Sequence, residues 1–66
     1  MEKDWVKIFS SEKLHEIEIL KGMLSDHGIQ SVSLNNQDSL YKTGEIELYV
    51  NRDNVIISKR IINTNN

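Results

Sequence analysis

The polar residues best suited to bind a ligand lie in one short segment near the middle of the chain: Asn35, Asn36, Gln37, Asp38, Ser39 and Tyr41. Their amide, carboxylate and hydroxyl groups both donate and accept hydrogen bonds, which is the chemistry of a polar small-molecule site. Asn, Asp and Ser are also common turn residues, because their side chains bond to the nearby backbone. A plain turn is the simpler interpretation, and the length of the loop argues for a ligand site.

Residues for nucleophilic catalysis are present but are not arranged for it. Ser10, Ser11, Asp38 and Glu47 are available, yet no spacing ties a serine to a base. The glycines Gly22, Gly28 and Gly44 are too far apart to form a phosphate-binding loop, and Gly22 is predicted to allow close packing of a helix on a sheet. The sequence therefore predicts a protein that is not an enzyme.

The two histidines do not form a metal-binding pattern. His15 and His27 are separated by about three helical turns, and His15-Glu16 is not followed by a second histidine at zinc-site spacing. The chain has no Cys, so it has neither a thiolate metal site nor a disulfide. No metal or cofactor is predicted. His15 is expected near a helix start with one edge in water, and His27 is expected at the helix end.

Length and charge restrict the classes of partner. The chain has 66 residues, enough for one domain with a thin core, so association with a second copy is expected. Lys and Arg number 8 and Asp and Glu number 10, giving a net charge of -2 that does not attract nucleic acid. No apolar run is long enough to span a membrane, and Met1-Glu2-Lys3-Asp4 lacks the basic-then-apolar character of a secretory signal, so a cytoplasmic location is expected.

The first half of the chain predicts a strand followed by a helix. Aromatic and β-branched residues from Asp4 to Phe9 favour a strand. Ser10-Ser11-Glu12 then provides helix-start signals. Apolar residues at helical spacing predict one buried stripe, made of Leu14, Ile17, Leu20 and Leu24 with Ile19 and Met23 on its flank. The helix should end at about His27, where Gly28 can adopt positive φ.

The second half predicts two strands and a further helix. Residues 29–35 and 45–50 alternate apolar with polar side chains, and the segment between them makes a hairpin with a long loop. Asn51-Arg52-Asp53-Asn54 can begin a helix through an Asn or Asp cap. Residues 55–62 are β-branched enough to form a strand instead, but a helix completes a known packing unit and is preferred. Residues 1–62 thus form the domain, and residues 63–66 a flexible tail.

This order of elements predicts an α+β, two-layer, ferredoxin-like β-α-β-β-α sandwich. Its three-stranded sheet has the order 1-3-2, with both helices on one face. Alternation along each strand then places one set of side chains on the uncovered face: Trp5, Lys7, Phe9, Ser31, Ser33, Glu47 and Tyr49.

The aromatic members of that face suggest a contact surface. Trp5, Phe9 and Tyr49 each carry ~150–250 Å² of surface that a partner can cover. The alternative is that these rings only pack on one another or on the ends of the domain. The contact interpretation predicts a homodimer, or a complex with another protein, through Trp5, Lys7, Phe9, Glu47 and Tyr49.

Several segments together resemble one bacterial family. These are Trp5-Val6-Lys7-Ile8-Phe9, the Lys21-Gly22-Met23-Leu24 turn of the helix, His27-Gly28-Ile29, the segment 35–39, and 44–50. The family consists of small domains of unknown function that are labelled prokaryotic signal transducing proteins. The resemblance covers about residues 4–62 and implies a ferredoxin-like fold, self-association and a regulatory role. It carries over no catalytic residue, and the zinc-binding segment of some relatives has no counterpart in this Cys-free chain.

Overall fold

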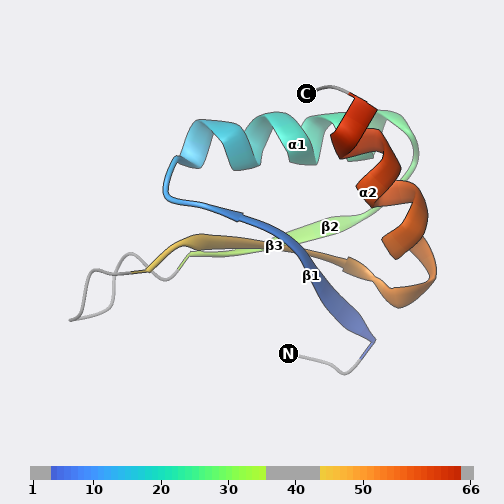
Figure 1. Cartoon of the computed structure of the whole chain (residues 1–66), viewed down its shortest axis with the longest axis horizontal. Coiled ribbons are helices and arrows are strands. Elements are labelled where there is room, and N and C mark those ends of the chain that lie inside the picture. Colours follow the sequence, from blue (N-terminus) through green and yellow to red (C-terminus); the bar gives the residue numbers. More distant parts are fainter. Residues whose placement is uncertain (1–3, 36–43, 65–66) are drawn as a thin grey trace.

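The computed structural model of the chain describes residues 4–35 and 44–64, and Figure 1 shows how they are arranged. Two helices cover one face of a three-stranded sheet. In chain order the elements are β1 (Trp5–Ser11), α1 (Leu14–Asp26), β2 (Ser31–Asn35), β3 (Ile46–Asn51), a 3₁₀ turn η1 (Arg52–Asn54) and α2 (Val55–Thr64). The predicted β-α-β-β-α order is therefore confirmed.

The sheet has the strand order β1-β3-β2, and β3 pairs antiparallel with both neighbours. The central position of β3 agrees with its strict alternation of apolar and polar residues. Ile46, Leu48 and Val50 have no exposed surface. Since successive side chains of a strand point to opposite faces, these three define the helix-covered face of the sheet.

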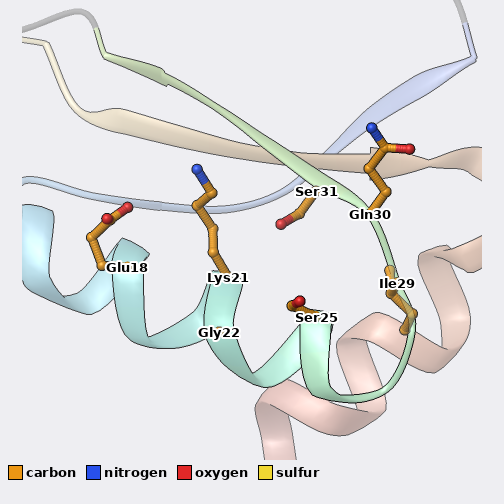
Figure 2. A pocket seen from close by; sticks show the side chains of 7 residues that line it. All are labelled: Glu18, Lys21, Gly22, Ser25, Ile29, Gln30 and Ser31. Atoms are coloured by element: carbon orange, nitrogen blue, oxygen red, sulfur yellow. The ribbon is translucent and has the colours of Figure 1, made fainter.

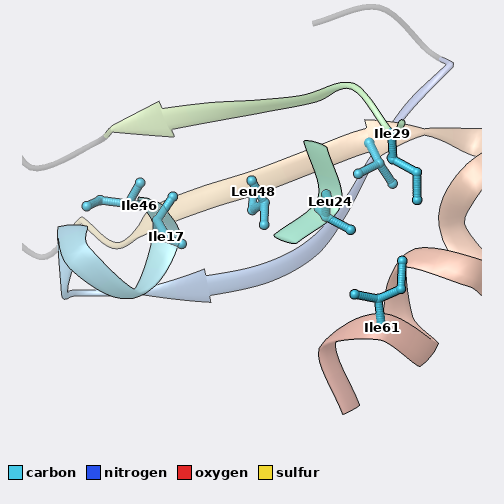
Figure 3. Close-up of a cluster of buried hydrophobic side chains, with 7 residues drawn as sticks. Ile17, Leu24, Ile29, Ile46, Leu48 and Ile61 are labelled. Atoms are coloured by element: carbon cyan, nitrogen blue, oxygen red, sulfur yellow. The ribbon is translucent and has the colours of Figure 1, made fainter. Parts of the chain in front are cut away.

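The core lies between this face of β3 and the two helices. Ile17 and Leu24 of α1 and Ile61 of α2 meet the apolar residues of β3, as Figure 3 shows. Ile29 completes the cluster from the segment between α1 and β2. Burying each such side chain is worth roughly 1.5–3 kcal/mol, so this small cluster supplies most of the apolar stabilisation. Leu14 and Ile19, which were expected to belong to the buried stripe, are exposed.

A β-bulge in β1 overturns the predicted position of Phe9. Lys7 pairs with Tyr49, but the register shifts after Lys7 and Phe9 pairs with Leu48. The extra residue, Ile8, moves the rest of the strand to the opposite alternation. Phe9 therefore lies on the helix-covered face, where it and Ile8 are half-buried against the core. The prediction that Phe9 lies on the uncovered face was wrong.

The alternation of β2 was also predicted on the wrong faces. Ser31 pairs with Val50 and Ser33 with Leu48, so both serines share the helix-covered face with their buried partners. Val32 and Leu34 lie on the other face. The reason is that Ile29, before the strand begins, provides the apolar contact to the core. The serines lie at the margin of the core beside α1, and Lys21 Nζ donates to Ser33 Oγ at 3.4 Å.

The C-terminal end of α1 follows the sequence signals, but the start of the helix lies later than predicted. Ser10 and Ser11 belong to β1, and the N-cap is Lys13, which makes no side-chain capping bond. Gly28 has φ of 75°, and the amides of Gly28 and Ile29 donate to the carbonyls of Ser25 and Leu24, each at 2.9 Å. This is the glycine-terminated helix end that the sequence predicted. At the other end, Ser11 Oγ accepts from the Lys13 amide at 3.1 Å and donates to Glu16 Oε1 at 2.6 Å.

Residues 55–62 form a helix, as preferred, and not a strand. Asn51 Oδ1 accepts from the Asp53 amide at 3.0 Å, which caps the 3₁₀ turn that leads into α2. The helix continues through Asn63 to Thr64, beyond the predicted domain end, and the Thr64 hydroxyl donates to the Arg60 carbonyl at 2.8 Å. Residues 65 and 66 lie outside the described part of the chain.

Candidate functional site

The face of the sheet opposite the helices carries a mixed apolar and charged surface. We call it the open face and define it by its residues, which are Trp5, Lys7 and Ser10 of β1, Val32 and Leu34 of β2, and Glu47 and Tyr49 of β3. No described helix covers it (Figure 1). Cross-strand pairing fixes this set, because partners in an antiparallel ladder share a face.

Glu47 lies at the centre of the open face and holds two neighbours. Tyr49 Oη donates to Glu47 Oε1 at 2.9 Å, and Lys7 Nζ lies 3.6 Å from Glu47 Oε2. The side chain of Glu47 is 24% exposed and that of Lys7 is 53% exposed. The three side chains thus form a short network in which the carboxylate is neutralised and the phenol is satisfied.

The same network suppresses ionisation of the phenol. The hydrogen bond to Glu47 raises the pKa of Tyr49 above its ordinary value of 10.0, and desolvation and the negative charge of Glu47 raise this pKa further. Tyr49 therefore remains a neutral hydrogen-bond donor at physiological pH. It can orient a carboxylate but is not prepared to act as a base or a nucleophile.

Apolar side chains flank the network on both sides. Val32 lies directly opposite Tyr49, and Leu34 lies opposite Glu47 with 42% of its surface exposed. Trp5 extends the surface along β1, where it pairs with Asn51. The open face thus combines apolar side chains with one neutralised ion pair.

The structure brings together most of the residues predicted for an interface. Trp5, Lys7, Glu47 and Tyr49 all lie on the open face, whereas Phe9 lies on the other side of the sheet. Sequence reasoning missed Val32 and Leu34, because it assigned the apolar residues of β2 to the core. The available signal was Ile29, which could have met the core in their place.

The predicted ligand loop falls mainly outside the described residues. This applies to Asn36, Gln37, Asp38, Ser39 and Tyr41. Asn35 is described: it is the last residue of β2, is exposed, and pairs with Ile46. The ligand-loop interpretation therefore remains a prediction.

Local contacts are made by His27, Ser10 and Ser11, and His15 is exposed on α1. His27 Nδ1 lies 2.9 Å from the Met23 carbonyl, so this ring bonds to the end of α1. Ser10 Oγ lies 3.5 Å from Glu45 Oε1, and Ser11 bonds to the start of α1. Across residues 4–35 and 44–64, no group of three or more His, Asp or Glu side chains is placed to hold a metal ion.

A polar groove that the sequence did not reveal runs between α1 and β2 (Figure 2). It has a volume of about 420 Å³. Its lining residues are Glu18, Lys21, Gly22 and Ser25 of α1, and Ile29, Gln30 and Ser31 at the start of β2. The only trace of it in the sequence is Gly22, a glycine in the middle of a helix.

Comparisons of the chain with protein-family models, with curated proteins and with solved structures give no match. The resemblance to the family of signal transducing proteins thus remains a prediction from the sequence. Within the described ranges, neither helix has the length and apolar character needed to cross a membrane.

Proposed function

We propose that this protein is a non-catalytic regulatory module that binds a second copy of itself through the open face. One observation carries the proposal: the register of β2 places Val32 and Leu34 beside Tyr49 on the side away from the helices. Apolar residues that could have faced the core instead face solvent, and they extend the surface begun by Trp5. The regulatory role itself rests on the family resemblance of the sequence.

The size of the open face fits a weak dimer. Three strands spaced by ~4.8 Å, each rising ~3.3 Å per residue, give a face of roughly 15 by 20 Å. Two such faces stacked together bury roughly 600–1,000 Å² of accessible surface, below the 1,200 Å² or more of a stable complex. Association should therefore depend on concentration, with dissociation constants in the micromolar range or weaker.

The charges on the open face favour a second copy over an unrelated partner. Lys7 and Glu47 place one positive and one negative group on the same surface. When two identical faces stack about a two-fold axis, Lys7 can approach the partner's Glu47, and the reverse contact forms by symmetry. Neither charge is left buried without a counter-charge, so the desolvation cost that opposes most charged interfaces is reduced.

Sedimentation velocity over a concentration series tests the proposal. A Val32→Ser/Leu34→Ser variant removes apolar surface from the open face, and Ile56→Ser is the matched control. Ile56 is 78% exposed on α2, on the other layer of the molecule. The wild type and Ile56→Ser should show the same increase in mean mass with concentration, and the double variant should remain a monomer. A monomeric wild type at about 1 mM, a concentration that detects even millimolar affinity, would refute self-association.

A further inference from the structure

Lys21 places a positive charge in the groove between α1 and β2. Lys21 is half-buried as a residue, and its ammonium donates to Ser33 Oγ at 3.4 Å. Among residues 4–35 and 44–64, it forms no ion pair with any carboxylate. An ammonium has three donors, and the bond to Ser33 uses one of them. The groove is therefore suited to receive an anionic group.

Gly22 keeps the wall of the groove open. It lies within α1, where glycine is a poor helix former, and its φ is not in the positive range that would require glycine. A Cβ built at this position meets no atom within 4 Å, so close packing on the sheet, as the sequence suggested, does not explain it. The missing side chain leaves free space next to Lys21 and Ser25, where a ligand can lie.

Glu18 adds a negative group to the same wall. Glu18 and Lys21 are three residues apart on α1, a spacing at which opposite charges often pair, yet the structure has no ion pair between them. Figure 2 shows both side chains extending from α1 on the groove side, with the Ser31 hydroxyl pointing back toward the helix. The groove thus presents one cation, one anion and serine hydroxyls to the same volume.

We propose that this groove binds a small zwitterion of the α-amino-acid class. The ligand carboxylate is received by Lys21, and the ligand ammonium by Glu18. The adjacent carboxylate and the net charge of -2 disfavour a dianion such as phosphate. A volume of about 420 Å³ lies within the range of small-molecule sites, and the buried Ile29 offers an apolar contact for a ligand side chain.

This site is independent of the proposed dimer. The groove lies on the helix side of the edge strand β2, and the open face lies on the opposite side of the sheet. A failure of ligand binding therefore leaves self-association untouched, and a failure of self-association leaves the groove untouched.

Nuclear magnetic resonance titration of the full chain provides the test. The probes are the proteinogenic L-amino acids at about 10 mM, a concentration that detects millimolar affinity, and inorganic phosphate at the same concentration. Single-charge controls are the amine and the carboxylic acid related to each amino acid that binds. At least one amino acid should shift the backbone amides of residues 18–25 and 29–33 in a saturable way. The single-charge analogues and phosphate should bind at least about tenfold more weakly.

Three variants assign the effect to the groove. Lys21→Met removes the cation, and Gly22→Leu fills the free space while keeping a good helix former. Lys59→Met removes an exposed lysine from α2 and serves as the control. Binding should weaken by at least about tenfold in the first two variants and remain unchanged in the third. Because a Cβ added at position 22 meets no atom within 4 Å, Gly22→Leu should remain folded, and its amide spectrum checks this directly.

Three results would overturn the proposal. The first is the absence of a saturable shift with every amino acid. The second is binding that Lys21→Met and Gly22→Leu leave intact. The third is tighter binding of phosphate than of any amino acid, which would identify a simple anion site.

Discussion

Tyr49 donates a 2.9 Å hydrogen bond to Glu47, two residues before it on the same face of the central strand. Lys7 approaches the second oxygen of the same carboxylate. This arrangement organises the open face, because it fixes the orientation of the two largest polar side chains of β3 there. It also makes the ionisation of Tyr49 a direct measure of whether the network exists in solution.

The phenol of Tyr49 should ionise above pH 10. Its pKa is raised in the folded state, mainly by the hydrogen bond to Glu47, so the folded state holds the proton more tightly than the unfolded state does. The associated stability is fully present below pH 10 and is lost as the pH rises through the folded-state pKa. Ultraviolet absorbance titration measures the ionisation of the phenols. The transition that is present in the wild type and absent from Tyr49→Phe belongs to Tyr49.

Glu47→Gln is the matched variant for this titration. It removes the negative charge and should move the pKa of Tyr49 back toward 10.0. An unchanged pKa in Glu47→Gln would show that the two side chains do not interact in solution.

Gly22→Ala should stabilise the protein by about 0.5–1 kcal/mol, because alanine is the better helix former and the added Cβ meets no atom within 4 Å. Urea denaturation measures the difference in the free energy of unfolding. Gly28→Ala is the contrasting variant: with φ of 75° it should destabilise by about 1–2 kcal/mol. A destabilising Gly22→Ala would mean that the groove wall is packed in solution.

Phe9→Ala should destabilise the protein by about 2–4 kcal/mol, because the β-bulge places the ring against the core. Lys7→Ala, two residues earlier on the open face, should change the free energy of unfolding by no more than about 0.5 kcal/mol. Thermal unfolding of the two variants gives the comparison. If both substitutions lowered the free energy of unfolding by the same small amount, Phe9 would lie on the surface, which would contradict the β-bulge.

Ser58→Ala should stabilise the protein by about 1 kcal/mol. The hydroxyl of Ser58 is fully buried on α2 and has no hydrogen-bond partner among the described residues. Ser25→Ala, at an exposed position of α1, measures the gain from helix propensity alone. The denaturation midpoint of Ser58→Ala should be higher than that of Ser25→Ala. Equal midpoints would indicate that the Ser58 hydroxyl has a hydrogen-bond partner in solution.

The order of elements could be predicted because its signals are local. Gly28 ends α1 through its positive φ, and Asn51 begins the turn into α2 through its side chain. The strict alternation of β3 identified which of its faces is buried, and its central position followed from the β-α-β-β-α order.

The faces of the outer strands could not be predicted because they depend on pairing. The bulge at Ile8 inverts the alternation of β1 halfway along, and no residue type marks it in the sequence. In β2, the apolar character of Val32 and Leu34 predicted that they face the core. In the structure Ile29 makes that contact with the core instead, and Val32 and Leu34 lie on the opposite face. The groove could not be predicted either, because its lining residues come from α1 and from residues 29–31, which become neighbours only in the folded chain.

The most direct test of the central claim is nuclear magnetic resonance of methyl and indole groups at increasing protein concentration. If two copies meet through the open face, the signals of Trp5, Val32 and Leu34 should shift together with one dissociation constant. The exposed Ile56 and Ile57 of α2 should stay constant. Shifts confined to the isoleucines, or no concentration dependence for Val32 and Leu34, would contradict self-association through this face.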